Sequence, residues 1–194
     1  MTIYSILESC IYMSLIIGVD PGSRKTGFGV IETVSKSSSQ IKYVTSGVIR
    51  LPSGPLPVRL GVIFDNISQL IDEFNPQQMA IEEVFLARDP SAAIKLGQAR
   101  GAAIVAGIKK NLVIGEYSPR TIKKSVVGNG GATKDQVQHM IKTILNLPSS
   151  PAEDAADALA AAICHAQTIS FGLNSEGLLH YSKGRLKQKI TTSS

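Results

Sequence analysis

The chain of 194 residues is 43% hydrophobic and 18% charged, which predicts one globular domain with a sizeable core. No apolar run is long enough to span a bilayer, no secretory leader is recognisable, and the two cysteines form no disulfide or zinc pattern, so we expect a cytoplasmic protein without membrane attachment. A net charge of +5 favours a polyanionic partner, but it fits an ordinary solvated surface about as well.

The first part of the chain predicts an antiparallel meander. Residues 14–20, 26–34 and 41–51 are apolar, β-rich runs joined by short connections. Residues 1–13 precede these runs and are expected to be an N-terminal extension that is either not native or disordered.

The middle of the chain alternates helix and strand. Apolar residues at helical spacing predict a helix over 58–74, followed by a strand over 77–85. Because a helix leads to this strand, we expect it to run parallel to the first one. Asp89 as N-cap and Pro90 open a long helix over 89–111, and residues 112–117 form a fifth strand.

Start signals predict three further helices. Ser118 opens one, Thr133 and Gln136 form a capping box for the next, and Ser150 with Glu153 do the same for the last. Residues 170–194 are polar and basic and are expected to form a tail. This order of elements predicts an α/β domain over 14–169, with a mixed five-stranded sheet flanked by helices on both faces.

Acidic side chains are expected to gather at one edge of this sheet. Asp20 ends the first strand, Glu82 and Glu83 end the fourth, and the carboxyl ends of parallel neighbours lie together. Asp154 and Asp157 share one face of the alanine-rich last helix, where a buried acid needs a partner or a metal. Singly, Asp20 fits an Asx turn and the two helical acids fit first-turn residues favoured by the helix dipole. Together they indicate a site.

Such a cluster on a basic protein indicates hard divalent cations. Carboxylates packed without a cation repel one another and their pKa values rise. Oxygen ligands favour Mg²⁺ or Mn²⁺ over zinc, and two such ions can clamp the attacking and leaving oxygens of a phosphodiester. We therefore expect two Mg²⁺ ions per site, with Mn²⁺ able to substitute.

Five blocks of sequence together resemble the RuvC family of Holliday-junction resolvases. They are IIGVDPGSRKTGFGVIE, AIEEVF, AIKLGQARG, VVGNGGATKDQVQHM and EDAADALAAAICHA, in the family's order and spanning nearly the whole core. The resemblance implies a ribonuclease-H-like fold over 14–169 and a homodimer that nicks two strands of a four-way DNA junction symmetrically with Mg²⁺. It also implies the RuvA and RuvB branch-migration proteins as partners.

The resemblance assigns roles to individual residues. Its catalytic, metal-binding acids fall on Asp20, Glu82, Asp154 and Asp157. The family acid is the first Glu of IEE, so Glu82 is preferred over Glu83. Active-site lysines fall on Lys123 and Lys134.

Candidates for DNA contact follow from the resemblance and from charge. The family's junction-stacking aromatic falls on Phe85, where stacking on an unpaired base and packing in the core remain equally good interpretations. Charge alone adds possible phosphate contacts, each of which fits a solvated surface side chain equally well: Arg24, Arg88, Arg120 and Lys124.

The long helix over 89–111 carries small residues at four-residue steps. Ala93, Gly97 and Gly101 would allow another backbone to approach closely. The partner is either the sheet of the same chain or, as the resemblance implies, a second subunit.

Parts of the sequence also fit three other functions. The GVDPGSRKTGFGV block also resembles the phosphate loop of sugar-kinase and actin-like ATPases, which need a second glycine-rich loop and a second domain. A catalytically inactive DNA-binding scaffold would not need four intact acids. A ribonuclease-H-like nuclease that acts on other branched or RNA-containing nucleic acids is the main alternative.

Overall fold

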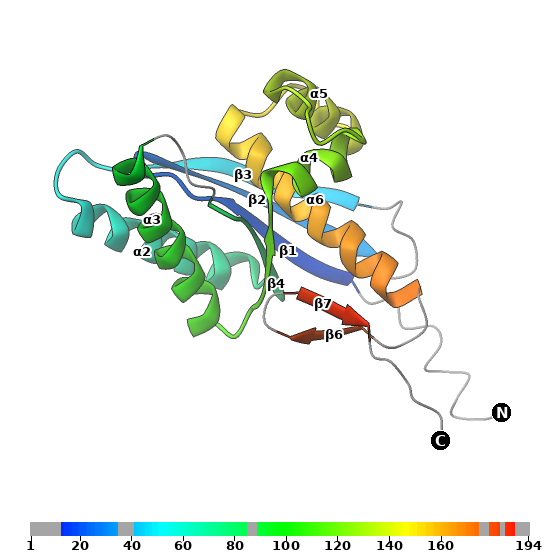
Figure 1. The fold of residues 1–194 in the computed structure, drawn as a ribbon, viewed down its shortest axis with the longest axis horizontal. Helices are drawn as coiled ribbons and strands as arrows, with labels where there is room; N and C mark the ends of the chain where they lie inside the picture. The colour runs from blue at the N-terminus through cyan, green and yellow to red at the C-terminus, as the bar shows by residue number, and fades with distance from the viewer. Residues whose placement is uncertain (1–12, 35–40, 85–88, 175–178, 183–184, 189–194) are drawn as a thin grey trace.

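The computed structural model describes residues 13–34, 41–84, 89–174, 179–182 and 185–188. Its main sheet has five strands in the order β3-β2-β1-β4-β5 (Figure 1). The antiparallel strands β1 (Met13–Asp20), β2 (Lys25–Val34) and β3 (Ile41–Arg50) are joined by β4 (Gln78–Glu82) and β5 (Val113–Tyr117), which run parallel to β1. The predicted mixed sheet and strand directions are confirmed.

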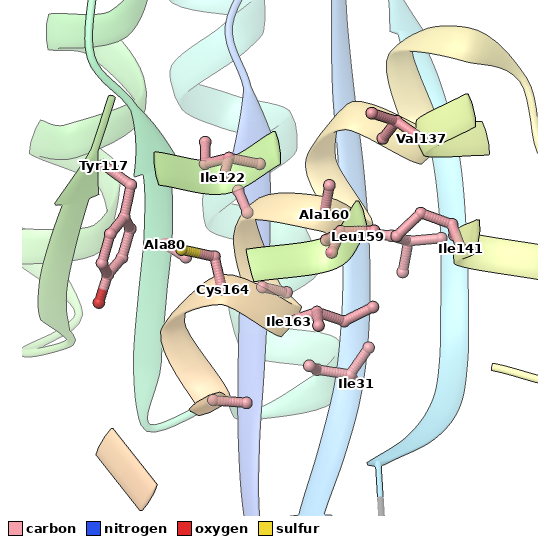
Figure 2. Packing of buried hydrophobic residues seen from close by; sticks show 14 of the residues in the cluster. Ile31, Ala80, Tyr117, Ile122, Val137, Ile141, Leu159, Ala160, Ile163 and Cys164 are labelled. Carbon is pink, nitrogen blue, oxygen red and sulfur yellow. The ribbon is translucent and has the colours of Figure 1, made fainter. Parts of the chain in front are cut away.

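Helices cover both faces of this sheet. The helices α2 (Leu56–Phe74) and α3 (Pro90–Lys109) lie on one face (Figure 1). On the other face α6 (Glu153–Asn174) lies directly on the strands, and α4 (Pro119–Val127) and α5 (Lys134–Ile144) pack against α6. Each face therefore has its own hydrophobic core. Ile17 belongs to the core under α2 and α3, whereas its neighbour Ile16 belongs to the core under α6, shown in Figure 2.

The helix α6 approaches the sheet more closely than side chains would normally permit. A methyl group added to Gly18 of β1 would overlap the carbonyl oxygen of Ala158, and one added to Gly27 of β2 would overlap that of Asp154. The alanines of α6 are buried against these strands; Ala158, for example, is 0% exposed. Small residues on both partners thus bring the first turns of α6 down onto the ends of β1 and β2.

A chain of buried polar side chains fixes the middle of α6 on the sheet. The imidazole of His165 lies 2.6 Å from the hydroxyl of Tyr117 on β5 and 2.7 Å from the amide oxygen of Gln78 on β4. Burial lowers the pKa of His165 to about 4, so the ring is neutral at physiological pH. It can then donate to Gln78 and accept from Tyr117, which satisfies both ring nitrogens.

The predicted helix starts are confirmed in two of three cases. Ser118 caps α4 by accepting from the Thr121 amide, and Thr133 and Gln136 form the expected capping box of α5. The capping box on Ser150 and Glu153 is wrong, because α6 begins at Glu153 and Ser150 therefore lies too early to be its N-cap.

Regular structure continues into the segment that the sequence assigns to a tail. The helix α6 extends to Asn174, and the short antiparallel strands β6 (Leu179–Ser182) and β7 (Arg185–Gln188) follow. Within the described ranges, no helix combines the length and apolar character that a bilayer crossing requires.

Gly97 and Gly101 of α3 do not face the sheet. A methyl group added to Gly97 or Gly101 would meet no atom within 4 Å, whereas Ala93 is 8% exposed and faces the core. The close partner that these two glycines could admit is therefore not the sheet of the same chain.

Candidate active site

Two of the predicted acids lie side by side at one edge of the sheet. The pairing of β1 with β4 ends at Val19 and Ile81, and the next residues on the two strands are Asp20 and Glu82. Both are partly buried, because α6 covers this edge. The carboxyl ends of two parallel strands thus present two carboxylates to the same region.

The first turns of α6 bring two more acids to this edge. Burial and then the charges of Asp157, Glu82 and Asp154 raise the pKa of Asp20 to about 7. Burial and the charge of Asp157 raise the pKa of Glu82 to about 7. The charges of residues 82, 154 and 157 therefore all act on Asp20, as expected from the strand ends and the helix face. We call these four side chains the acid cluster.

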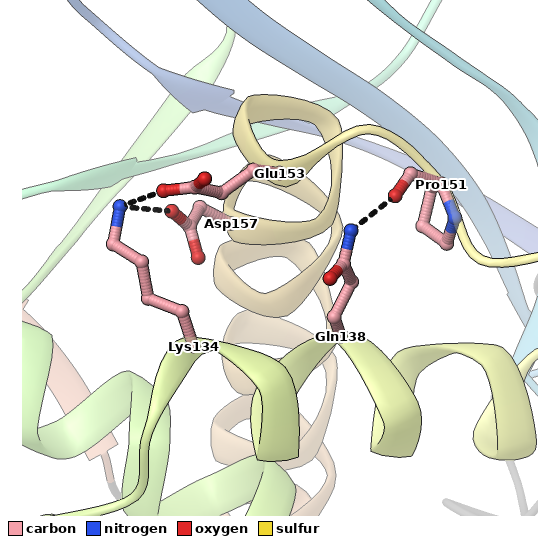
Figure 3. A network of polar contacts seen from close by, with 5 residues as sticks. All are labelled: Lys134, Gln138, Pro151, Glu153 and Asp157. Carbon is pink, nitrogen blue, oxygen red and sulfur yellow. Dashed lines mark hydrogen bonds and ion pairs between the residues drawn. The ribbon is translucent and has the colours of Figure 1, made fainter.

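Two lysines face the acid cluster. Lys134, the first residue of α5, pairs with Glu153 and lies 3.8 Å from a carboxylate oxygen of Asp157 (Figure 3). One turn further along α5, the Gln138 amide donates to the carbonyl of Pro151 at 2.6 Å, which ties α5 to the approach to α6. The charge of Lys123 on α4 opposes the rise in the pKa of both Glu82 and Asp157. The structure therefore brings both sequence-predicted lysines to the cluster.

The chemistry of the acid cluster fits a hard divalent cation. Across the described parts of the chain, no three His, Cys, Asp or Glu side chains are drawn together tightly enough to enclose a metal ion as they stand. Burial first, and then the negative charge of neighbouring carboxylates, nevertheless raises the pKa values of Asp20 and Glu82. Carboxylate oxygens are the donors that Mg²⁺ and Mn²⁺ prefer, and a cation would relieve this repulsion.

The two adjacent glutamates at the end of β4 differ in environment. Glu82 is partly buried beside Asp157, whereas Glu83 is exposed and its amide donates to the Tyr117 carbonyl at 2.8 Å. This difference agrees with the preference for Glu82 as the site acid. The charge of Glu83 acts on Arg100 of α3, a residue that the sequence analysis did not single out. No local signal set Arg100 apart, because Lys95 and Gln98 also interrupt the small and apolar residues of α3.

The remaining predicted DNA contacts divide into two groups. Arg24, in the turn after Asp20, and Arg120 and Lys124, on α4, have exposed side chains. Phe85 and Arg88 lie outside the described residues, so their predicted roles stay predictions.

The pKa of Asp20 predicts an unusual pH dependence of stability. Its pKa is raised in the folded protein, so the unfolded chain loses this proton first and stability falls as the pH rises from about 4 to about 7. In the absence of divalent cations, Asp20→Asn should therefore raise the free energy of unfolding at pH 8 by on the order of 2 kcal/mol. Melting temperatures at pH 8 and below pH 4 measure this. The gain should disappear at the lower pH, and an equal gain at both would contradict the electrostatic cause.

The fold and the placement of the acids define an α/β protein of the ribonuclease-H-like class. The sequence profile described as "Crossover junction endodeoxyribonuclease RuvC" matches residues 16–165, and the chain belongs to this RuvC family. The crossover junction endodeoxyribonuclease RuvC of Teredinibacter turnerae is 52% identical over 179 residues, covering 89% of this chain and 99% of the relative. The protein of the same name from Edwardsiella ictaluri is 50% identical over 176 residues, covering 90% and 100%.

A solved structure supports the same assignment. Thermus thermophilus RuvC in complex with a Holliday junction substrate superposes with a TM-score of 0.76 and 32% identity, covering 82% of this chain and 96% of that one. The family is one of metal-dependent nucleases, in agreement with the acid cluster. Membership of this family leaves no role for the actin-like ATPase interpretation of the first block.

Proposed function

We propose that this protein is a Mg²⁺-dependent endodeoxyribonuclease that resolves Holliday junctions by symmetric paired nicks in DNA recombination and repair. The observation that carries the proposal is the gathering of the acid cluster, from two strand ends and one helix, with two lysines beside it. We choose a four-way junction over other branched or RNA-containing substrates because the similar RuvC of Thermus thermophilus was solved in complex with a Holliday junction substrate.

The four acids are the proposed cation ligands: Asp20, Glu82, Asp154 and Asp157. A bound pair of Mg²⁺ ions would activate water and stabilise the leaving 3′-oxygen of the cut phosphodiester. Because the pKa values of Asp20 and Glu82 are about 7 in the unliganded chain, both carboxyls are partly protonated at neutral pH. They would release these protons when cations bind.

The lysines have a separate role in this proposal. Lys134 is 64% exposed and Lys123 lies close enough to the cluster to act on two of its acids. An ammonium group in this position can bind a phosphate oxygen of the DNA strand and compensate charge that develops there. In the unliganded chain, Glu153 and Asp157 hold Lys134 at the cluster, where that phosphate would arrive.

Exposed basic side chains are the proposed DNA contacts. Arg24, Arg120 and Lys124 would bind backbone phosphates on either side of the cut, together with Arg88. Phe85, five residues before α3, is the proposed base-stacking residue.

A homodimer built on α3 is also part of the proposal. The exposed face of α3 carries Gly97 and Gly101 together with large apolar side chains, since Ile94, Val105 and Ile108 are 63%, 50% and 57% exposed. Apolar side chains around open glycines suit close helix packing against a second copy. A two-fold dimer would place two acid clusters on the two equivalent strands of a junction.

Disruption of this face should separate the subunits. We expect Ile108→Glu to convert the dimer to a monomer, because a carboxylate buried in the contact between α3 and a second copy is strongly unfavourable. The mass in solution, measured by light scattering during size-exclusion chromatography, should fall by half, and paired nicks should become single nicks. Glu73→Gln, at an exposed position of α2, is the control and should remain dimeric. A dimeric Ile108→Glu protein would contradict the α3 interface.

The proposal extends to location and partners. Residues 14–169 form the proposed nuclease domain, residues 1–13 an extension and residues 170–194 a basic tail. The protein is proposed to act in the cytoplasm, where RuvA and RuvB would present the junction to it.

Metal dependence tests the proposed chemistry directly. Purified protein should cut a labelled four-way junction when Mg²⁺ is present, stop when EDTA is added, and recover with Mn²⁺. Cutting that persists in EDTA would contradict the role of the acid cluster as a cation site.

A further inference from the structure

One partly buried cation of α3 reaches the backbone of a proposed site acid. The side chain of Arg100 is 19% exposed, and its Nε donates to the carbonyl oxygen of Glu82 at 2.9 Å. The end of its guanidinium pairs with a carboxylate oxygen of Glu116 on β5. Arg100 thus joins a helix to the ends of two neighbouring strands.

Glu82 lies just beyond the pairing of β4 with β1, while it still pairs with Tyr117 of β5. The pairing between β1 and β4 ends one residue earlier, at Val19 and Ile81. The hydrogen bond that the Glu82 carbonyl accepts from the charged guanidinium of Arg100 is stronger than one between neutral groups. Since the carbonyl and the side chain share one Cα atom, a carbonyl held in place also limits where the Glu82 carboxylate can point.

The opposite side of the same peptide is held as well. The amide of Glu83 donates to the carbonyl of Tyr117 at 2.8 Å, and Tyr117 follows Glu116 on β5. Arg100, Glu116 and Tyr117 therefore fix the peptide between Glu82 and Glu83 from two directions. The negative charge of Glu83 also acts on the same guanidinium.

We propose that Arg100 is a positioning residue that, anchored by Glu116, holds the backbone of Glu82 so that its carboxylate stays in the acid cluster. This inference rests on the proposed nuclease function. The guanidinium of Arg100 is bound to the Glu82 carbonyl and the Glu116 carboxylate, and no contact with DNA is assigned to it. Its loss should therefore weaken cation use and the cutting step, and should leave junction binding largely intact.

Three variants test this role. Arg100→Ala removes the hydrogen bond and the ion pair, Arg100→Lys keeps the charge without the planar guanidinium, and Glu116→Gln removes only the anchoring charge. Lys109→Ala is the control, because it removes an exposed charge from the last turn of the same helix. Each protein is measured for single-turnover cutting of a four-way junction over a range of Mg²⁺ concentrations, and for junction binding in Ca²⁺.

The expected pattern differs from that of a general loss of structure. Arg100→Ala should cut about 10- to 100-fold more slowly and need several-fold more Mg²⁺, with junction affinity within about threefold of the wild type. Glu116→Gln should change the same quantities less, Arg100→Lys should restore part of the rate, and Lys109→Ala should match the wild type.

A measurement on the protein alone, without metal or DNA, completes the test. Hydrogen exchange of the Glu83 amide should become about tenfold faster in Arg100→Ala, while amides of α5 keep their protection. Equal loss of protection at both places would show a general loss of structure and overturn the inference.

Two kinetic results would also overturn it. One is a wild-type cutting rate and wild-type Mg²⁺ dependence in both Arg100→Ala and Glu116→Gln. The other is a loss of junction affinity in these variants while the cutting rate and Mg²⁺ dependence stay unchanged. The wild type is the reference throughout, so its own failure to cut a junction would count against the proposed function and not against Arg100.

Discussion

Asp154→Asn should reduce junction cutting on the order of 10³-fold or more while junction binding remains. Asp154 lies in the first turn of α6, its backbone rests on Gly27, and its charge acts on Asp20. An amide keeps the size of the side chain but cannot supply the negative oxygen that a bound Mg²⁺ needs. The remaining cutting activity should not rise when the Mg²⁺ concentration is increased. The variant lacks one carboxylate ligand of the cation, and a higher concentration of Mg²⁺ cannot replace that ligand.

Single-turnover cutting and a gel-shift binding assay measure the two halves of this prediction. Asp135→Asn is the matched control, since it makes the same change at an exposed position in the first turn of α5. It should cut and bind like the wild type. Normal cutting by Asp154→Asn would remove Asp154 from the cation site.

Gly27→Ala should lower both stability and cutting. A methyl group at Gly27 would overlap the carbonyl of Asp154, so α6 must move away from β2. Added volume in a packed contact costs about 1–3 kcal/mol of unfolding free energy. The displaced turn carries Asp154 and Asp157, and a shift of about 1 Å at a catalytic group can reduce the rate about 100-fold.

Gly61→Ala separates this effect from the general consequence of replacing glycine. Gly61 is exposed within α2, and an added methyl group there meets no atom within 4 Å. That variant should gain about 0.5–1 kcal/mol of stability, because alanine favours the helix, and its cutting should not change. Thermal unfolding and single-turnover cutting compare the two. If Gly27→Ala melts and cuts like the wild type, close contact between α6 and the sheet does not position the acids.

The order and directions of the elements were predictable from local signals. Apolar runs, helical spacing and the residues that begin helices are properties of short segments, and they identified five strands and most helix starts. The Ser150 capping box failed because its pattern matches a helix start two residues too early. In the structure, Glu153 pairs with Lys134 of α5, a contact between segments that no local pattern contains.

The candidate site was predictable for a different reason. Asp20 and Glu82 follow strands whose parallel pairing could be inferred, so their meeting needed only topology. Arg100 was missed because its partners are a backbone carbonyl on β4 and a glutamate on β5. Backbone acceptors have no sequence signature. The orientation of the α3 glycines was also undecided, since sequence spacing says which residues share a face but not what that face meets.

The central claim is that the acid cluster cuts four-way junctions in preference to other nucleic acids. Its most direct test gives the wild-type protein, with Mg²⁺, three substrates of the same sequence: a four-way junction labelled on each strand in turn, a linear DNA duplex and an RNA–DNA hybrid. The account predicts nicks at symmetric positions in two opposing strands of the junction and little cutting of the other two substrates. Equal or faster cutting of the linear duplex or of the hybrid would contradict it.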